Sequence, residues 1–272
     1  MEINNKIILF IPCYNCQDQI PRVLNSLKEN DNYKKFAEIL IIDNRSSDRT
    51  VEKSIAAVKS LELYNAAVYT NSTNVGLGGT HKMAFRHAQQ VNATHIAVLH
   101  GDDQGNINDL ISLIDSQQIN VYDCCLGSRF SHDSRLMGYA KLRIFGNYIF
   151  NLIYSVCSFH LVKDLGAGLN IYQVPAIADV RILKFSNDLT FNCFLLLYSI
   201  SQKQKIRYFP VEWREDDQIS NVKLFSQAIR TLKIAVNYLF NGLNGLMAIG
   251  DNTIDFDNVS LEEKYKWNNS ND

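Results

Sequence analysis

Short apolar runs alternate with stretches of helical periodicity between residues 6 and 106, and this alternation restricts the fold more than any other feature. The runs that suit buried strands are residues 6–11, 38–42, 66–69 and 96–99. Between them, apolar residues recur at helical spacing in 17–27, 49–61 and 74–91. Strands that alternate with helices build parallel sheets, because each crossover helix covers one face of the sheet. The sequence therefore predicts an α/β fold with a Rossmann-like, mostly parallel sheet and helices on both faces.

The second half of the chain continues with strands and longer helices before a polar tail. Strands are expected at 121–126, 169–172 and 205–211, and helices at 142–161, 188–201 and 222–240. The 272 residues suit one large domain over 1–240, followed by a tail at 241–272. From Asp251 onward this tail is acidic and rich in asparagine, so we expect it to be partly disordered.

Composition and charge exclude several classes of protein. The net charge of −1 provides no general basic surface for nucleic acid. Cys13 and Cys16 have C-x-x-C spacing, but the adjacent Cys124 and Cys125 do not supply the second pair of a zinc site, so buried thiols are expected. The first residues have no signal-peptide pattern, which predicts a reducing, cytoplasmic location.

No apolar run reaches the roughly 18 residues that a spanning helix needs. The nearest, 148–162, predicts either a core helix or a helix that lies in a membrane interface.

Polar residues collect where the predicted strands end. Asp43 follows one strand, Asn74 with three nearby glycines follows the next, and the segment HGDDQG follows 96–99. In open α/β sheets, ligands bind outside the carboxyl ends of the strands. Oxygen ligands suit Mg²⁺ or Mn²⁺, which usually bind carboxylates together with substrate phosphates. The segment therefore predicts a metal–diphosphate site whose ligands are Asp102, Asp103 and Gln104, or else a polar turn that caps the next helix. The glycines do not match a dinucleotide-binding motif or a P-loop.

Seven motifs in order carry a family resemblance that covers about residues 6–235. They are IPCYN at 11–15, IIDNRSSDRT at 41–50, NVGLGG at 74–79, HGDDQG at 100–105, GSRF at 127–130, DLGAGLNIY at 164–172 and WREDDQISNVK at 213–223. Together they resemble the family 2 glycosyltransferases, which have a GT-A fold. The last three resemble the polyprenyl-phosphate branch, typified by dolichyl-phosphate mannosyltransferase.

The resemblance implies inverting, metal-dependent transfer of a hexose from a nucleoside-diphosphate sugar, of the GDP-mannose or UDP-glucose type. The acceptor it implies is a polyprenyl phosphate or lipid-linked glycan, met by a cytoplasmic or peripheral protein at the membrane surface. The positions that match nucleotide-sugar-binding residues are Pro12, Tyr14, Asp43, Asn44, Gly101, Asp102 and Gln104. The positions that match the acceptor-phosphate site are Arg129, Arg143 and Asn147, and Arg214 and Lys223 match a basic loop that closes on the phosphates.

Several positions depart from the family pattern. Cys16, Asn44 and His100 stand where acidic residues are usual, which leaves open a catalytically silent protein that binds nucleotide sugars. Arg143 also fits a solvated charge on a helix.

The identity of the acceptor decides which chemistry the site needs. A phosphate acceptor is already ionised at neutral pH, so it needs orientation by arginine rather than a base. A sugar hydroxyl, as in surface polysaccharide synthesis, requires a carboxylate base. Asp164 and Asp188 are the candidates, and Asp164 also suits a structural cap. The catalytic residues expected from sequence are thus Asp102, Arg129, Asp164, Arg214 and Lys223.

Overall fold

The computed structural model describes residues 5–215, 224–251 and 253–267, and its centre is an eight-stranded sheet with the order β10-β3-β2-β1-β4-β7-β5-β8. Strands β1 (Ile7–Cys13), β2 (Glu38–Asp43), β3 (Ala66–Asn71) and β4 (His95–Val98) run parallel. These are the four strands that the apolar runs predict, and the α/β prediction is confirmed.

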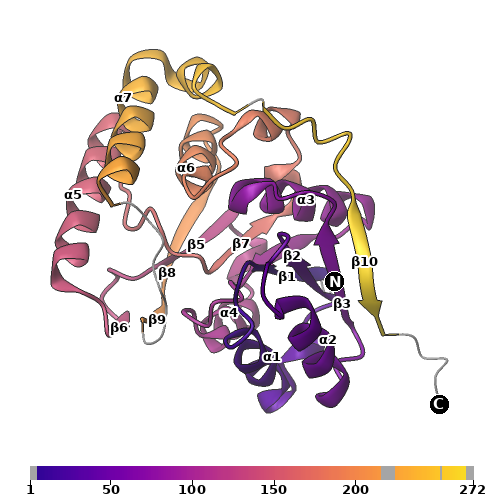
Figure 1. Cartoon of the computed structure of the whole chain (residues 1–272). Coiled ribbons are helices and arrows are strands. Elements are labelled where there is room, and N and C mark those ends of the chain that lie inside the picture. Colours follow the sequence, from indigo (N-terminus) through magenta and orange to yellow (C-terminus); the bar gives the residue numbers. More distant parts are fainter. Residues whose placement is uncertain (1–4, 216–223, 252, 268–272) are drawn as a thin grey trace.

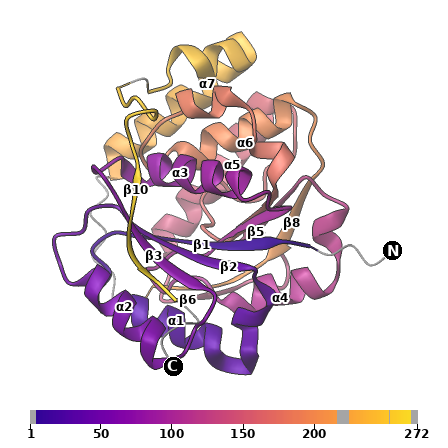
Figure 2. The same cartoon turned by 90° about the vertical axis from the view of Figure 1, so that its right-hand side faces the viewer.

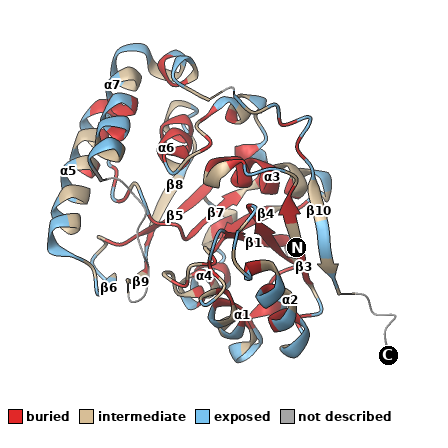
Figure 3. Ribbon diagram, in the orientation of Figure 1, coloured by how far each residue is buried: buried red, intermediate tan, exposed pale blue. Residues whose placement is uncertain are grey.

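Helices cover both faces of the sheet (Figure 2). One face packs on α1 (Ile20–Lys28), α2 (Thr50–Ser60) and α4 (Ile107–Asp115). The other packs on α3 (Gly76–Gln90), α5 (Lys141–Ser158), α6 (Phe191–Ser201) and α7 (Leu224–Ala248). Side chains alternate between faces along a strand, so in β1 Ile7 and Leu9 enter one core while Ile8 and Phe10 enter the other. Figure 3 shows this double core as the buried centre of the molecule.

The second half of the chain adds antiparallel pairing to the sheet. Strand β7 (Asn170–Gln173) lies antiparallel between β4 and β5 (Cys124–Ser128), and β8 (Ile206–Pro210) runs parallel to β5 at the edge. Two short strands, β6 (Arg135–Met137) and β9 (Glu212–Arg214), form a separate parallel pair. Helix α7 runs past residue 240 with a kink at Gly242, whose φ is 54°, so the expected domain boundary falls inside a helix.

The C-terminal segment is more ordered than its composition predicts. Strand β10 (Leu261–Lys266) pairs antiparallel with β3, and Phe256 and Val259 are buried against Val75 and Met83 of the α3 region. Residues 261–266 form a strand in spite of their polar composition, because main-chain pairing with β3 and a few apolar anchors nearby hold them.

Two expectations about compartment can be compared with the structure. Within the described ranges, no helix combines the length and the apolar character that crossing a bilayer requires. All six cysteines lie in the described part of the chain, and all are buried free thiols, as the sequence predicts.

Candidate active site

The candidate site lies where the order of the parallel strands reverses, with β1 between β2 and β4. Loops that follow these strands are tied together by hydrogen bonds. The backbone N–H of Asn15 donates to Ser46 Oγ at 2.8 Å, and Asn15 Oδ1 accepts from the backbone N–H of Ser47 at 2.9 Å. The backbone N–H of Gly101 donates to the Pro12 carbonyl at 3.0 Å. The sheet thus places the expected nucleotide-binding segments at one edge, at a topological switch point.

Of the residues expected to bind the nucleotide, Tyr14 is exposed, whereas Asp43 and Asn44 are buried and make hydrogen bonds within the protein. Tyr14 is exposed at the end of β1, while Asp43 is buried and accepts the backbone N–H of Ser46 at 3.1 Å, as a turn-capping residue does. Asn44 is buried, and its amide is occupied: it donates to Asn74 Oδ1 at 3.0 Å and accepts from Asn71 and the Val75 backbone. The expectation that Asn44 binds the base or ribose does not fit this geometry, because the side chain links β2 to β3 and to the start of α3.

Gly101 of the HGDDQG segment packs directly over the C-x-x-C thiols. A Cβ added at this position would lie 2.6 Å from Cys13 Sγ and 3.3 Å from Cys16 Sγ. The hydrogen bond with Cys16, together with burial, raises the pKa of the Cys13 thiol well above its ordinary value. Both cysteines therefore pack against the segment, and the Cys13 thiol is held in its protonated form.

The carboxylates of this segment have different environments. Asp102 has a side chain about 31% exposed, and its Oδ2 lies 3.9 Å from Nδ1 of His100, which burial keeps neutral by lowering its pKa to about 4. Asp103 is buried with a φ of 61°, and it accepts from Arg22 Nε at 2.7 Å and from the Arg214 guanidinium. Asp103 therefore does not fit the expected role of metal ligand, because arginines occupy both of its oxygens.

Arg214 is expected from sequence to bind donor phosphates, and in this structure it contacts the HGDDQG segment instead. Its Nε donates to the Asp103 carbonyl at 2.8 Å, and its backbone N–H donates to the Gln104 carbonyl at 3.0 Å. Strand β9 is thereby fastened to the loop that follows β4. Lys223, the other expected cation of this region, lies outside the described residues.

A buried ion pair forms the centre of the acceptor side. Asp164 Oδ2 accepts from the backbone N–H and Nε of Arg129, and its Oδ1 accepts from Arg129 Nη2, each at 2.8 Å. The guanidinium also lies 5.5 Å from the ring centres of Phe130, Tyr139 and Trp213. Although burial alone would lower it, the Asp164 carboxylate holds the pKa of Arg129 above its ordinary value. In this structure Asp164 and Arg129 are paired with each other, so the expected base role of Asp164 and phosphate contact of Arg129 would each require this pair to break.

A tyrosine that the sequence did not single out joins the expected acceptor residues. Tyr139 Oη accepts from Arg129 Nη1 at 3.0 Å and from Asn147 Nδ2 at 2.9 Å. Arg143, one turn before Asn147, donates from Nη1 to both carboxylate oxygens of Glu215 at 2.7 and 2.8 Å. The structure therefore brings Arg129, Tyr139 and Asn147 together, while Arg143 is held by an acid of the β9 region.

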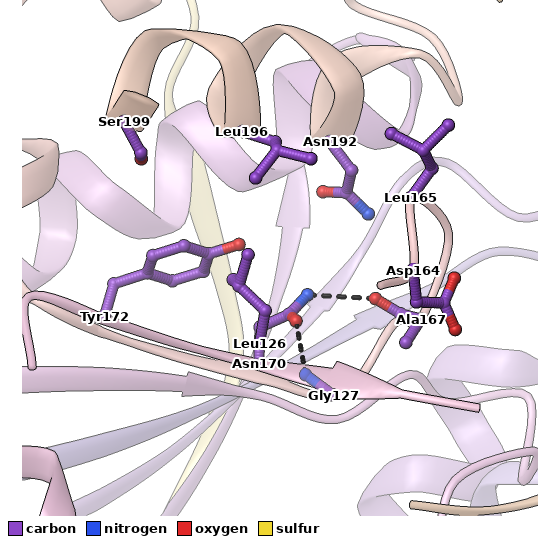
Figure 4. A pocket seen from close by; sticks show the side chains of 10 residues that line it. All are labelled: Leu126, Gly127, Asp164, Leu165, Ala167, Asn170, Tyr172, Asn192, Leu196 and Ser199. Atoms are coloured by element: carbon purple, nitrogen blue, oxygen red, sulfur yellow. Dashed lines mark hydrogen bonds between the residues drawn. The ribbon is translucent and has the colours of Figure 1, made fainter. Parts of the chain in front are cut away.

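The loop that carries Asp164 is supported from below by Asn170 (Figure 4). Asn170 Nδ2 donates to the Ala167 carbonyl at 3.0 Å, and its Oδ1 accepts the backbone N–H of Gly127 at 3.2 Å. Beside it lies a cavity of about 20 Å³, lined by polar atoms of Asn192 and Ser199, which is large enough for one water molecule. Asp188, the second candidate base, instead caps the start of α6 through Thr190 and pairs with Arg230 at 2.7 Å.

Comparison with known proteins identifies the class of enzyme to which this site belongs. Residues 8–180 match the family model described as glycosyl transferase family 2. The chain belongs to glycosyl transferase family 2. It is therefore a glycosyltransferase, and the expected α/β architecture of the GT-A fold is confirmed.

Solved structures similar to this family 2 chain share its fold at low sequence identity. The structure of glucosyl-3-phosphoglycerate synthase from Mycobacterium tuberculosis in complex with UDP superposes with a TM-score of 0.62 at 12% identity, covering 87% of this chain and 81% of that chain. A complex of that enzyme with Mn²⁺, UDP-glucose and phosphoglyceric acid has a TM-score of 0.63 at 11% identity, covering 87% and 80%. S. aureus TarS 1-349 in complex with UDP-GlcNAc has a TM-score of 0.54 at 18% identity, covering 90% and 73%.

The donor atoms of this family 2 site suit a hard cation that takes most of its ligands from substrate and water. Asp102 is partly exposed, and its Oδ1 accepts the backbone N–H of Gln104 at 3.3 Å. The described residues contain no group of three His, Cys, Asp or Glu side chains placed to hold a metal ion. One carboxylate and one carboxamide fit Mg²⁺ or Mn²⁺, which bind few protein oxygens when a diphosphate is present.

Several residues of this family 2 site were missed in the sequence. Arg22 and Glu215 contact the expected site residues Asp103 and Arg143, which are 81 and 72 residues away, and Tyr139 contacts Arg129, 10 residues away. Trp213 is buried against Arg129, and its Nε1 has no hydrogen-bond partner within the described structure. A useful signal was available for Trp213 and Glu215, since both lie in the motif at 213–223, whereas Arg22 and Tyr139 lie outside the seven motifs.

Proposed function

We propose that this glycosyltransferase transfers a hexose, with inversion, from a nucleoside-diphosphate sugar to a polyprenyl phosphate. The observation that carries the proposal is the network of Arg129, Tyr139 and Asn147 at the start of α5. It orients the Tyr139 hydroxyl beside a helix whose exposed side is apolar, which suits an acceptor with a polar head and a lipid tail.

On the donor side, Asp102 and Gln104 would hold the divalent cation, and Pro12, Tyr14 and Asp43 would border the nucleotide. The cation supplies positive charge to the departing diphosphate. Arg214 would add positive charge at the diphosphate only after it releases Asp103, to which it is bound in this structure. We propose Lys223 as the second cation that contacts the diphosphate. The similar structures contain uridine nucleotides, so UDP-sugars come before GDP-sugars in a donor screen.

On the acceptor side, the reaction would need no strong base. The two carboxylates next to the network, Asp164 and Glu215, each accept hydrogen bonds from an arginine. A phosphate is ionised at neutral pH and attacks without losing a proton. Tyr139 accepts from two donors, so its own hydroxyl proton is available to a phosphate oxygen, and it orients the nucleophile.

A second candidate is transfer to a saccharide hydroxyl. The observation that favours it is charge balance, because Asp164 and Glu215 already neutralise Arg129 and Arg143. An uncharged acceptor would be compatible with such a balanced site, whereas a phosphate must compete with Glu215 for Arg143.

The first test is binding of the donor. Thermal denaturation is followed with UDP, GDP and their hexose conjugates, with and without Mn²⁺, for the wild type and Asp102→Ala. A nucleotide present at 100 times its Kd stabilises the fold by about 2.7 kcal/mol, so a real site is detectable. We expect stabilisation that needs Mn²⁺ and that Asp102→Ala abolishes. Asp133→Ala, which removes an exposed carboxylate, is the matched control and should behave as wild type.

The second test separates the two acceptors. The selected radiolabelled nucleotide sugar is offered to a short-chain polyprenyl phosphate and, separately, to oligosaccharides. Label in the lipid phosphate supports the proposal, and label only in oligosaccharides supports the second candidate. Absence of nucleotide binding in the first test would refute both.

A further inference from the structure

Helix α5 has one exposed side (Figure 3), and the residues on that side are almost all apolar. After Lys141, every exposed residue of the helix is apolar: Leu142, Phe145, Tyr148, Ile149, Leu152 and Val156. Leu142 is 80% exposed and Leu152 is 66% exposed, so these are not partly covered core residues. The face continues past the helix end through Phe159, which is 89% exposed.

Helix α7 packs beside α5 and extends the apolar surface. Tyr154 Oη of α5 donates to the Thr231 carbonyl of α7 at 2.9 Å. The exposed apolar residues of α7 are Phe225, Ile229, Leu232, Val236, Leu239 and Phe240. We call the exposed apolar residues of both helices, with Phe159 and Leu161, the α5–α7 face. Two neighbouring helices that both expose large apolar side chains indicate an interaction site.

The charged side chains that α5, α7 and their flanking residues contribute to this face are all basic. Neither residues 141–163 nor residues 224–250 contain any of the 28 acidic residues of the chain. Lys141, Lys163 and Lys233 are exposed at its margins. Among the described residues, Glu215 and Asp188 are acids of other elements that pair with arginines of α5 and α7. An apolar surface with lysines at its edge is complementary to an anionic lipid surface.

We propose that the α5–α7 face docks on an anionic lipid bilayer. The exposed residues of α5 span roughly 120° of the helix at 100° per residue, which is wider than the narrow seam of a two-stranded coiled coil. A second copy docked on the same face would bring the marginal lysines of both chains together, whereas anionic headgroups attract them. The 18 residues of α5 cover about 27 Å, enough to lie along a membrane interface.

The reason for such docking rests on the proposed function, because a lipid-linked acceptor is held in the membrane. Arg143 and Asn147 of the acceptor side belong to the first turns of the same helix. A lipid phosphate would therefore reach the site from the surface on which α5 lies.

The experiment is flotation of the whole chain with phosphatidylcholine vesicles, with or without phosphatidylglycerol. The apolar variant carries Leu142→Gln, Leu152→Gln and Val156→Gln. Its matched control carries Tyr64→Gln, Val121→Gln and Val180→Gln, which replace exposed apolar residues elsewhere. A charge variant carries Lys141→Gln, Lys163→Gln and Lys233→Gln.

We expect the wild type and the matched control to float with phosphatidylglycerol vesicles. The apolar variant and the charge variant should each bind at least about tenfold more weakly. Equal flotation of the wild type and the apolar variant overturns the proposal, and so does a wild type that does not float. A wild-type dimer in solution that the apolar variant dissociates would assign the face to a second copy instead.

Flotation is measured without substrate, so the two proposals fail separately. A chain that floats but never labels a polyprenyl phosphate refutes only the proposed function. A chain that labels a short, water-soluble polyprenyl phosphate but does not float refutes only the docking surface.

Discussion

The buried pair of Arg129 and Asp164 permits a direct test of what Asp164 does. Asp164→Ala removes the acceptor of three hydrogen bonds from Arg129 and one from the backbone N–H of Gly166. The Arg129 side chain is about 7% exposed, so its guanidinium would stay buried without a counter-charge. Breaking a buried pair by removing one partner typically costs about 3–5 kcal/mol, and we expect Asp164→Ala to lower the free energy of unfolding by that amount.

The assay is urea denaturation of a double-mutant cycle. Its members are Asp164→Ala, Arg129→Met and the double variant Arg129→Met/Asp164→Ala. We expect each single change to be strongly destabilising and the double variant to cost clearly less than their sum, because it leaves no buried charge unpaired. Asp133→Ala, at a carboxylate about 77% exposed, should change stability by no more than about 0.5 kcal/mol.

Two results would refute this reasoning. The first is a loss below about 1 kcal/mol for Asp164→Ala, which is the range of an exposed pair. The second is Asp164→Asn that unfolds like the wild type but has no activity with a hydroxyl acceptor, since this combination would identify Asp164 as a base rather than a positioning residue.

Three other changes test separate parts of the structure. Burial lowers the pKa of His81 to about 3, so stability present above the unfolded-state value of 6.5 is lost as the pH falls below it. In His81→Gln the free energy of unfolding should therefore fall less steeply below pH 6.5, by up to about 1.4 kcal/mol per pH unit. Urea denaturation that gives the same pH dependence for this variant and the wild type would contradict the prediction. Tyr139→Phe should lower kcat/KM for the acceptor about tenfold with unchanged donor binding, and an equal change in donor Kd would count against its acceptor role. Gly101→Ala should destabilise the fold by about 1–3 kcal/mol, because its Cβ would lie 2.6 Å from Cys13 Sγ. Adding Cys13→Ala to Gly101→Ala should restore most of the lost stability, because it removes the sulfur atom. A double variant that denatures at the same temperature as Gly101→Ala would contradict the clash.

Local patterns were sufficient to predict the elements of the fold and the general position of the site. The apolar run at 96–99 and the helical spacing at 17–27 depend on neighbouring residues, and both predict the observed β4 and α1. The polar turn after β4 could be placed at the sheet edge because parallel strands end on the same side. Strand β10 could not be found in this way, because its sequence is polar and its pairing with β3 joins residues about 190 positions apart.

Ionic pairing was the part of the site that sequence could not supply. Asp103 was expected to hold a metal because it adjoins Asp102, yet its partners Arg22 and Arg214 are 81 and 111 residues away. Arg143 and Glu215 are separated by 72 residues. A charged side chain in a motif indicates that a charge is present, but its counter-charge is decided by the tertiary fold.

The ion pairs also constrain how the acceptor phosphate could bind. Arg129 is enclosed by Asp164 and three aromatic rings, so a change of partner would leave the buried Asp164 carboxylate without its counter-charge, at a cost of several kcal/mol. Arg143 and Glu215 have side chains about 29% and 19% exposed, and water can take over the contacts of either group. A phosphate acceptor would therefore displace Glu215 from Arg143 and leave the Arg129 pair intact. In that arrangement Arg143 supplies charge, while Arg129 holds Tyr139 in place to donate its hydroxyl proton.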